Sequence, residues 1–199
     1  CRGVEAFPMK SLYYASRFWH AARFANEHTL RREAGIRVAL LDRAAVAERF
    51  GLDAGAALLS ETAAVVDPYQ LTHALLARLR RAKHGVFDKT TMVRIEPGAR
   101  DVRVRFDTGA VVRCRHVVLA CGYETQAYAK GSVARNRSSY AYVTEPQARP
   151  LGPLETTMVW ESARPYLYLR RTADRRLVVG GEDDAIDVAA RRDARVIAK

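Results

Sequence analysis

Five aromatic side chains toward the C-terminal end of the sequence could form the wall of a small-molecule site. Tyr140, Tyr142, Trp160, Tyr166 and Tyr168 fall on three consecutive segments whose patterns are typical of β-strands. Phenol and indole groups on neighbouring strands offer flat apolar surface together with hydrogen-bonding groups, which suits a small organic ligand. Plain cross-strand packing explains the same pattern equally well, so both interpretations stay open.

The segment at residues 165–184 predicts a β-hairpin that ends in paired glycines. One face of this hairpin is expected to be aliphatic, and the other is expected to carry Tyr166 and Tyr168. Gly180 and Gly181 indicate that either a neighbouring segment or a flat bound molecule approaches the backbone closely, and a neighbouring segment is the favoured interpretation.

A second candidate site follows the apolar segment at residues 117–120. A segment that is apolar on both faces predicts a strand inside a parallel sheet. Ligands of open α/β sheets bind beyond the carboxyl ends of such strands, which is where Cys121 and Gly122 stand. The glycine permits close backbone approach, whereas the Cys121 thiol is expected to be buried and unreactive because no histidine partner is signalled nearby.

Residues 116–125, residues 139–146 and the hairpin together resemble the D-amino-acid oxidase and glycine oxidase family of FAD-dependent oxidoreductases. The likeness runs from about residue 9 to residue 188. It implies an α/β fold of the α+β kind, in which part of a Rossmann-like FAD-binding domain joins a substrate domain built on a mixed or antiparallel sheet with helices. It also implies an enzyme that oxidises the C–N bond of an amino acid or amine.

The resemblance also implies which residues face the two ligands. The substrate-facing candidates are Tyr166, Tyr168, Trp160 and Tyr142. The cofactor-facing candidates are Val93, beside the adenosine part of FAD, and Ala120, Cys121, Gly122, Gly180 and Gly181. No general base is assigned, since the protein in such enzymes positions the substrate and controls the flavin rather than supplying a nucleophile.

The chain departs from the family pattern in ways that bear on the cofactor. None of its 12 glycines has the GxGxxG spacing that places the FAD pyrophosphate at a helix N-terminus, and no Gly-Leu-Arg-Pro segment is present to hold a substrate carboxylate. The chain also begins at Cys1 rather than at a methionine. We therefore expect an internal fragment, completed by N- and C-terminal segments of a parent chain, that retains FAD weakly or not at all.

Two local departures concern single positions. Residues 120–122 are Ala-Cys-Gly where the family usually has Ala-Thr-Gly, which replaces a hydroxyl by a thiol. Residues 174–176 are Asp-Arg-Arg where the family tends to have Asp-Gly-Arg. If the hairpin turn requires a positive φ at Arg175, that residue is strained.

The chain is expected to divide into four regions. Residues 1–64 and 126–190 would belong to the substrate domain, the first as a strand, two helices and a strand, and the second as sheet. Residues 65–125 would form part of the FAD-binding domain, and residues 191–199 would begin a further helix. The expected strands are residues 9–15, 58–66, 86–95, 102–106, 110–114, 139–145 and 156–161, with residues 36–41 as an apolar connection.

Three helices carry clear signals. The first begins near residue 16 and ends at Gly35, with Phe18 and Trp19 expected in the core. The second covers residues 43–50 with Asp42 as its N-cap. The third begins with Asp67 as N-cap and proline at its first position. Its predicted buried stripe is Leu71, Leu75, Leu76 and Leu79.

Composition narrows the classes of function. The formal net charge of +11 would attract phosphates, but only five of the 33 basic residues are lysines and the arginines are spread along the chain. A nucleic-acid role is therefore disfavoured. The alternative that stays open is a catalytically inactive, basic α/β module that binds a protein or nucleic-acid partner.

Cysteine usage and hydropathy bear on the compartment. The three cysteines form no CxxC pair and the five histidines are scattered, so neither a disulfide framework nor a metal site is indicated. A reducing cytoplasm is the expected location. No apolar run approaches the roughly 18 residues that a membrane-spanning helix needs, so no membrane partner is expected.

Overall fold

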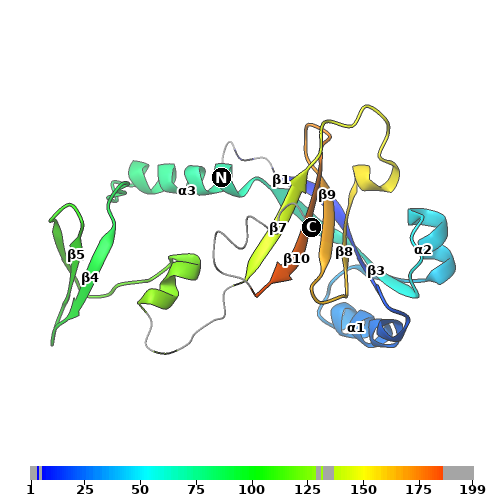
Figure 1. Ribbon diagram of the computed structural model, residues 1–199, viewed down its shortest axis with the longest axis horizontal. Helices are drawn as coiled ribbons and strands as arrows, with labels where there is room; N and C mark the ends of the chain where they lie inside the picture. Colours follow the sequence, from blue (N-terminus) through cyan, green and yellow to red (C-terminus); the bar gives the residue numbers. More distant parts are fainter. Residues whose placement is uncertain (1–3, 5, 129–130, 132–136, 186–199) are drawn as a thin grey trace. The chain divides into compact units, whose positions relative to one another are not determined.

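The chain folds into two compact units, shown in the computed structural model of Figure 1. The structure describes residue 4, residues 6–128, residue 131 and residues 137–185. One unit, here the sheet unit, combines residues 5–67 with residues 136–199, and the other, here the α3 unit, comprises residues 1–4 and 68–135. The sheet unit is therefore assembled from two separate stretches of chain.

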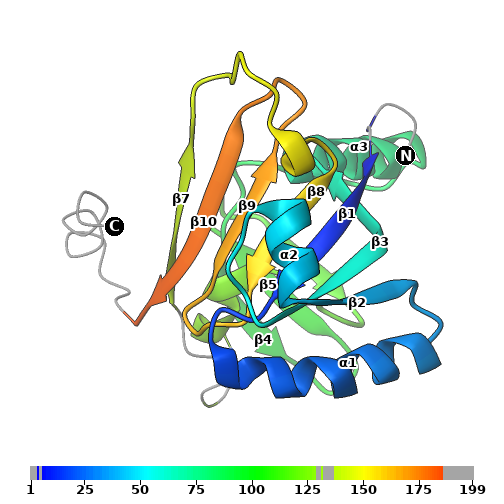
Figure 2. The same ribbon diagram turned by 90° about the vertical axis from the view of Figure 1, so that its right-hand side faces the viewer.

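The sheet unit is built on a seven-stranded mixed sheet in the order β2-β3-β1-β8-β9-β10-β7 (Figure 2). The β1–β8 pair is parallel, and it joins the N-terminal stretch of the unit to the C-terminal stretch. The other neighbouring pairs are antiparallel. The strands are β1 (Ala6–Tyr14), β2 (Val38–Asp42), β3 (Ala56–Val66), β7 (Ser138–Val143), β8 (Thr157–Glu161), β9 (Leu167–Arg171) and β10 (Leu177–Asp184).

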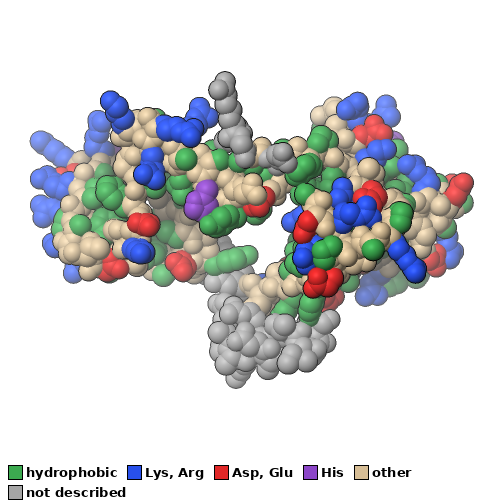
Figure 3. All heavy atoms as spheres, turned by 90° about the horizontal axis from the view of Figure 1, so that it is seen from above, with side chains coloured by type: hydrophobic (Ala, Val, Ile, Leu, Met, Phe, Trp, Pro, Cys, Tyr) green, Lys and Arg blue, Asp and Glu red, His purple; other side chains and the backbone are tan. Residues whose placement is uncertain are grey.

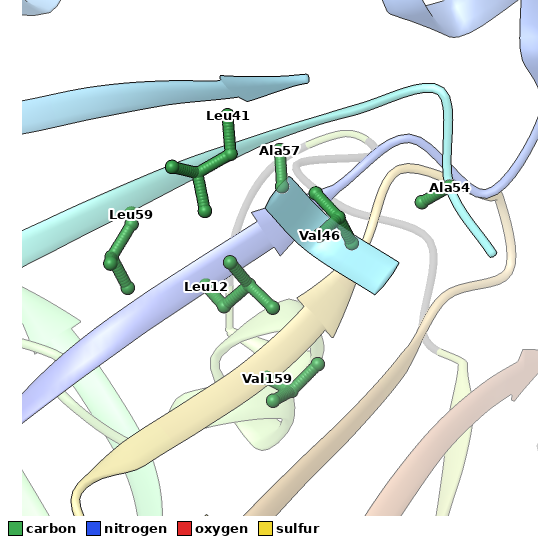
Figure 4. Packing of buried hydrophobic residues seen from close by; sticks show 7 residues of the cluster. All are labelled: Leu12, Leu41, Val46, Ala54, Ala57, Leu59 and Val159. Carbon is green, nitrogen blue, oxygen red and sulfur yellow. The ribbon is translucent and has the colours of Figure 1, made fainter. Parts of the chain in front are cut away.

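Helices α1 (Ala21–Glu33) and α2 (Arg43–Phe50) pack on opposite faces of this sheet. Leu58 and Leu59 are consecutive residues of β3, so their side chains point to opposite faces. Leu58 joins Phe24 of α1 in one buried cluster, and Leu59 joins Val46 of α2 in another. Figure 4 shows Val46 against Leu12 and the other residues of the second cluster. We call these faces the α1 face and the α2 face.

The α3 unit contains α3 (Pro68–Arg81), the short 3-10 helix η2 (Gly122–Ala127) and a three-stranded antiparallel sheet. Its strands are β4 (Met92–Pro97), β5 (Val102–Phe106) and β6 (Val111–Cys114). Among the described hydrophobic side chains of this unit, Val104 alone is buried. Figure 3 accordingly shows hydrophobic side chains at the surface of the α3 unit.

The predicted burial of the leucine stripe on α3 is wrong. The helix itself is confirmed, but none of its residues is buried, and Leu75 is 45% exposed. The physical reason is that α3 makes no extensive contact with another helix or strand that the structure describes. An amphipathic pattern specifies which side of a helix can be buried, whereas burial also requires a packing partner.

The predictions for the other two helices are confirmed except at the start of the first. Asp42 caps α2, since its Oδ1 accepts a hydrogen bond of 2.9 Å from the backbone N–H of Ala45. The first α-helix starts at Ala21 rather than near residue 16, and a 3-10 turn, η1 (Phe18–His20), precedes it. Phe18 and Trp19 are exposed, because their rings pack edge to face on each other on η1 rather than in the core.

Three of the strand predictions require correction. Residues 36–41 were expected to be a connection, but β2 pairs there with β3 because Val38 and Leu41 find buried positions beside it. The strand predicted over residues 86–95 begins only at Met92. Residues 117–120 form no strand, and Val118 is 86% exposed. A strand needs a partner for its backbone groups, and no described segment pairs with these residues.

The predicted hairpin is present as β9 and β10, and its turn contains the strained residue that the sequence indicated as a possibility. Arg175 has a φ of 65°. Its guanidinium offsets this strain by donating to the carbonyl oxygens of Gln147 and Arg149, at 3.0 and 2.8 Å, and by pairing with Glu155 at 3.1 Å. Glu155 ends a third 3-10 helix, η3 (Gly152–Glu155). The helix expected over residues 191–199 lies outside the described residues.

Candidate functional site

Three of the predicted substrate-facing aromatics lie together on the α1 face of the sheet. The strand register places Trp160 opposite Tyr168 and also opposite Tyr13, so Trp160, Tyr168 and Tyr13 share one face. Tyr166 directly precedes β9, and its ring centroid lies 6.2 Å from that of Tyr168. Tyr13 connects this group to α1, since its ring stacks on Phe24 at 4.9 Å. We call Trp160, Tyr166 and Tyr168 the aromatic face.

Tyr142, the fourth predicted residue, lies on the opposite side of the sheet. It pairs with Val179, which in turn pairs with Leu169, and Leu169 packs against the cluster of the α2 face. Tyr140 is two residues away on the same strand and therefore shares the face of Tyr142. The sheet separates these two tyrosines from the aromatic face, so the five rings do not form one wall.

The paired glycines make room for residues of the hairpin itself. A Cβ built on Gly180 would overlap the phenol of Tyr168, and one built on Gly181 would overlap the carbonyl group of Tyr166. Gly181 also has a φ of +128°, which side chains rarely adopt. The interpretation that a neighbouring segment approaches these glycines is confirmed. Contact of the same glycines with flavin stays a prediction.

Glu161 is a positioning residue that the sequence did not single out. Its Oε1 accepts a hydrogen bond of 3.0 Å from the backbone N–H of Leu167, and its Oε2 accepts one of 3.3 Å from the Tyr14 hydroxyl. These bonds fix the start of β9 and thereby the place of Tyr166. Burial, reinforced by the Glu161 carboxylate, raises the pKa of Tyr14 to about 12. In the sequence, Glu161 was distinguished only as the last residue of the strand predicted over residues 156–161.

The remaining cofactor candidates belong to the α3 unit. Val93 is an exposed residue of β4, and Ala120 is exposed in a segment without regular structure. Cys121 is exposed rather than buried, because the strand that was expected to bury it does not form. Gly122 has a φ of +56° with open space where a Cβ would stand, so backbone there is accessible to a ligand. Their contact with FAD stays a prediction.

The described residues do not fit the pyrophosphate of FAD. A dinucleotide cradle needs a glycine-rich loop that leads from a strand into a helix N-terminus. The helix α1 follows β1 through residues 15–20, which contain no glycine. The helix α2 begins directly after β2 with Asp42 as its cap, and α3 begins at Pro68 after Asp67. None of the three α-helices is therefore preceded by a loop of that kind within the described residues.

The described part of the chain contains neither a metal site nor a membrane-spanning helix. These residues contain no group of three or more His, Cys, Asp or Glu side chains placed to hold a metal ion. None of their helices is both long and apolar enough to span a membrane.

Comparison with known proteins identifies the family and the fold. The model of the DAO family, described as FAD dependent oxidoreductase, matches residues 4–198. No curated protein sequence matches the chain. L-proline dehydrogenase from P. horikoshii is similar in structure, with a TM-score of 0.74 and 17% identity over 89% of this chain and 49% of that chain.

Two further solved structures show the same fold. Glycine oxidase from Geobacillus kaustophilus has a TM-score of 0.71 and 16% identity over 97% of this chain and 55% of that chain. A mutant of NikD, an unusual amino acid oxidase essential for nikkomycin biosynthesis, has a TM-score of 0.66 and 18% identity over 92% of this chain and 51% of that chain. The chain thus spans about half the length of these structures. The mixed α/β fold predicted from the sequence is confirmed, and the chain belongs to the DAO family of FAD-dependent oxidoreductases.

Proposed function

We propose that the chain forms the substrate-domain sheet and part of the FAD-binding domain of an enzyme that oxidises the C–N bond of an amino acid or amine. The sheet unit would be the substrate-domain part, and the α3 unit would belong to the FAD-binding domain. Family membership supports the reaction class. The observation that carries the substrate role is the grouping of Trp160, Tyr166 and Tyr168 on one face of the sheet.

The proposed role of these residues is to bind and orient rather than to react. The oxidation is the chemistry that a bound flavin supplies in this family. Tyr166 offers a phenol that can hydrogen-bond a polar group of the substrate, and Trp160 offers apolar surface that excludes water. The indole of Trp160 is held in place because its Nε1–H donates to Ser11 Oγ at 2.9 Å. Such fixed groups lower the entropic cost of orienting a substrate.

Substitution of Tyr166 tests this role in the flavoprotein that contains the chain. Tyr166→Phe should lower kcat/KM for amine substrates by about tenfold, the usual effect of losing one hydrogen bond to a substrate group. Tyr142→Phe is the matched control, since it removes the same hydroxyl from the opposite face and should leave kcat/KM unchanged. Equal losses in both variants, or no loss in Tyr166→Phe, would contradict the proposal.

We further propose that the chain by itself holds FAD weakly or not at all, because the sequence lacks the GxGxxG spacing. Purified chain mixed with FAD and passed through a desalting column should show no flavin absorbance. A stoichiometric flavin spectrum after this step would refute the proposal.

The alternative of a basic binding module rests on the net charge of +11. Figure 3 shows Lys and Arg side chains spread over both units and interspersed with acidic ones on the visible face. A titration with short duplex DNA at physiological salt separates the two ideas. Tight binding that weakens steeply with added salt would favour the module, and its absence would leave the enzyme proposal ahead.

A further inference from the structure

A cavity of about 320 Å³ lies on the α1 face of the sheet unit, beside the connection between β8 and β9. We propose that this cavity binds a small organic anion, whose charge meets arginine side chains and whose apolar body meets aromatic rings. The cavity shares Trp160 with the aromatic face, but the proposal concerns binding alone, so its test requires no oxidation. The volume of the cavity lies at the lower end of the roughly 300–1,000 Å³ that small-molecule sites have, so the expected ligand has the size of a single ring with a short side chain.

The lining of the cavity has an excess of positive charge. Three arginines line the cavity: Arg23 and Arg31 of α1, and Arg164 of the β8–β9 connection. The lining contains one acidic residue, Glu27. Glu27 is already paired, since its Oε1 lies 2.7 Å from Nε of Arg31. Within the described part of the chain, no ion pair involves Arg23 or Arg164. The Arg164 guanidinium lies over the Tyr166 ring, 5.2 Å from its centroid, and one of its nitrogens donates to the Ala163 carbonyl oxygen. Its other N–H donors and those of Arg23 can bind an anion, and arginine suits carboxylates through its fork of N–H donors.

Hydrogen bonds around Ser162 fix two further polar side chains of the lining. The Ser162 Oγ accepts a bond of 3.2 Å from the backbone N–H of Ser16 and lies 2.6 Å from Nδ1 of His20. The same Oγ also lies 3.3 Å from the Ser16 Oγ. These contacts hold the His20 ring and the Ser162 hydroxyl in place, and both side chains carry groups that can hydrogen-bond a ligand. His20 and Ser162 both line the cavity.

Stacked rings form the apolar wall. Trp160 stacks on Tyr13 with ring centroids 4.1 Å apart, and Tyr13 stacks on Phe24 at 4.9 Å. All three rings line the cavity, and they come from β8, β1 and α1. A bare inorganic anion would use the guanidinium groups but leave this wall in contact with water. An anion with a flat apolar body uses both, which is why we assign an organic carboxylate rather than phosphate.

Trp160 provides a direct probe, because the chain contains only two tryptophans. The Trp19→Phe variant leaves Trp160 as the single fluorophore. It should show a saturable fluorescence change with 3-phenylpropionate at constant ionic strength. The uncharged 3-phenylpropionamide lacks the charge, and inorganic phosphate lacks the apolar body. Each should therefore bind at least about tenfold more weakly than 3-phenylpropionate. No saturable change with the carboxylate, or equal binding of the amide or of phosphate, would overturn the proposal.

Paired arginine variants locate the site. In the Trp19→Phe background, Arg23→Gln with Arg164→Gln should weaken 3-phenylpropionate binding by about tenfold or more. The matched control, Arg32→Gln with Arg49→Gln, removes the same charge from residues outside this cavity and should leave binding unchanged. Equal weakening in both pairs would overturn the proposal by showing attraction to the basic surface in general. Circular dichroism checks that the variants fold, and the ligand series decides the matter if one does not.

Discussion

The sheet unit and the α3 unit respond to the same kinds of sequence signal with very different degrees of packing. In the sheet unit, residues from both chain stretches form a buried cluster on each face of the sheet. In the α3 unit, Val104 is the single buried hydrophobic residue among those described. Yet α3 has one of the clearest start signals in the sequence. The comparison teaches that local signals form an element, whereas burial depends on whether another element covers it.

Truncation of buried and exposed leucines should show this difference at its largest. Leu58→Ala removes a fully buried side chain from the sheet unit and should lower its free energy of unfolding by about 2–5 kcal/mol. Leu75→Ala on α3 removes the same atoms from an exposed position and should cost less than about 1 kcal/mol. Urea unfolding followed by amide hydrogen exchange in peptides of each unit measures both. Comparable losses in the two units would break the comparison.

Glycine substitutions should give the next largest difference. Gly181→Ala places a methyl group against the carbonyl group of Tyr166 at a φ of +128°, so it should cost about 2 kcal/mol or more. Gly122→Ala in the α3 unit meets open space and bears only the cost of its φ of +56°, about 1 kcal/mol. Thermal unfolding of the two variants checks the order, and a larger loss for Gly122→Ala would contradict it.

Removal of a local signal inside the packed unit should have a smaller effect than removal of a buried side chain. Asp42→Ala deletes the N-cap bond of α2 and should cost about 1 kcal/mol. Asp42→Asn is the control, because its side-chain oxygen can still accept from Ala45 and stability should be nearly retained. The measurement is urea unfolding followed by tryptophan fluorescence, since both tryptophans lie in the sheet unit. A loss as large as that of Leu58→Ala would show that the cap outweighs burial.

The last expected effect is a pH dependence at Tyr14, which changes stability only above about pH 10. Its pKa is raised to about 12, above the value of roughly 10 for an unfolded tyrosine. The unfolded chain therefore loses this proton first, and stability falls as the pH rises from about 10 to about 12. Spectrophotometric titration should detect a late-ionising tyrosine that disappears in Tyr14→Phe and persists in Tyr123→Phe. Its persistence in Tyr14→Phe would contradict the assignment.

Much of the fold could be predicted because its signals are local. The cap at Asp42 and the strained hairpin turn at Arg175 depend on residues close in sequence. The strand predicted at residues 117–120 failed because an apolar run does not reveal whether partner strands exist. Phe18 and Trp19 were misplaced for a similar reason, since hydrophobic spacing does not show where a helix gives way to a 3-10 turn.

The candidate site could likewise be predicted only where it depends on local sequence. Alternation in the sequence placed Tyr166 and Tyr168 on one face of a hairpin, and the structure adds Trp160 to that face while assigning Tyr142 to the other. The anion cavity was not predicted, since its helix and its strand connection lie well over one hundred residues apart in the chain.

The sequence by itself determined the family, the class of fold, the helix caps and the alternation of the strands, because each depends on residue types at short spacing. Tertiary structure alone decided which aromatic rings share a face, that Tyr168 occupies the space beside Gly180, and that Arg23 and Arg164 line one cavity. The physical reason is that strand register and the packing of a helix on a sheet bring distant residues together. Neither is specified by any one segment of the chain.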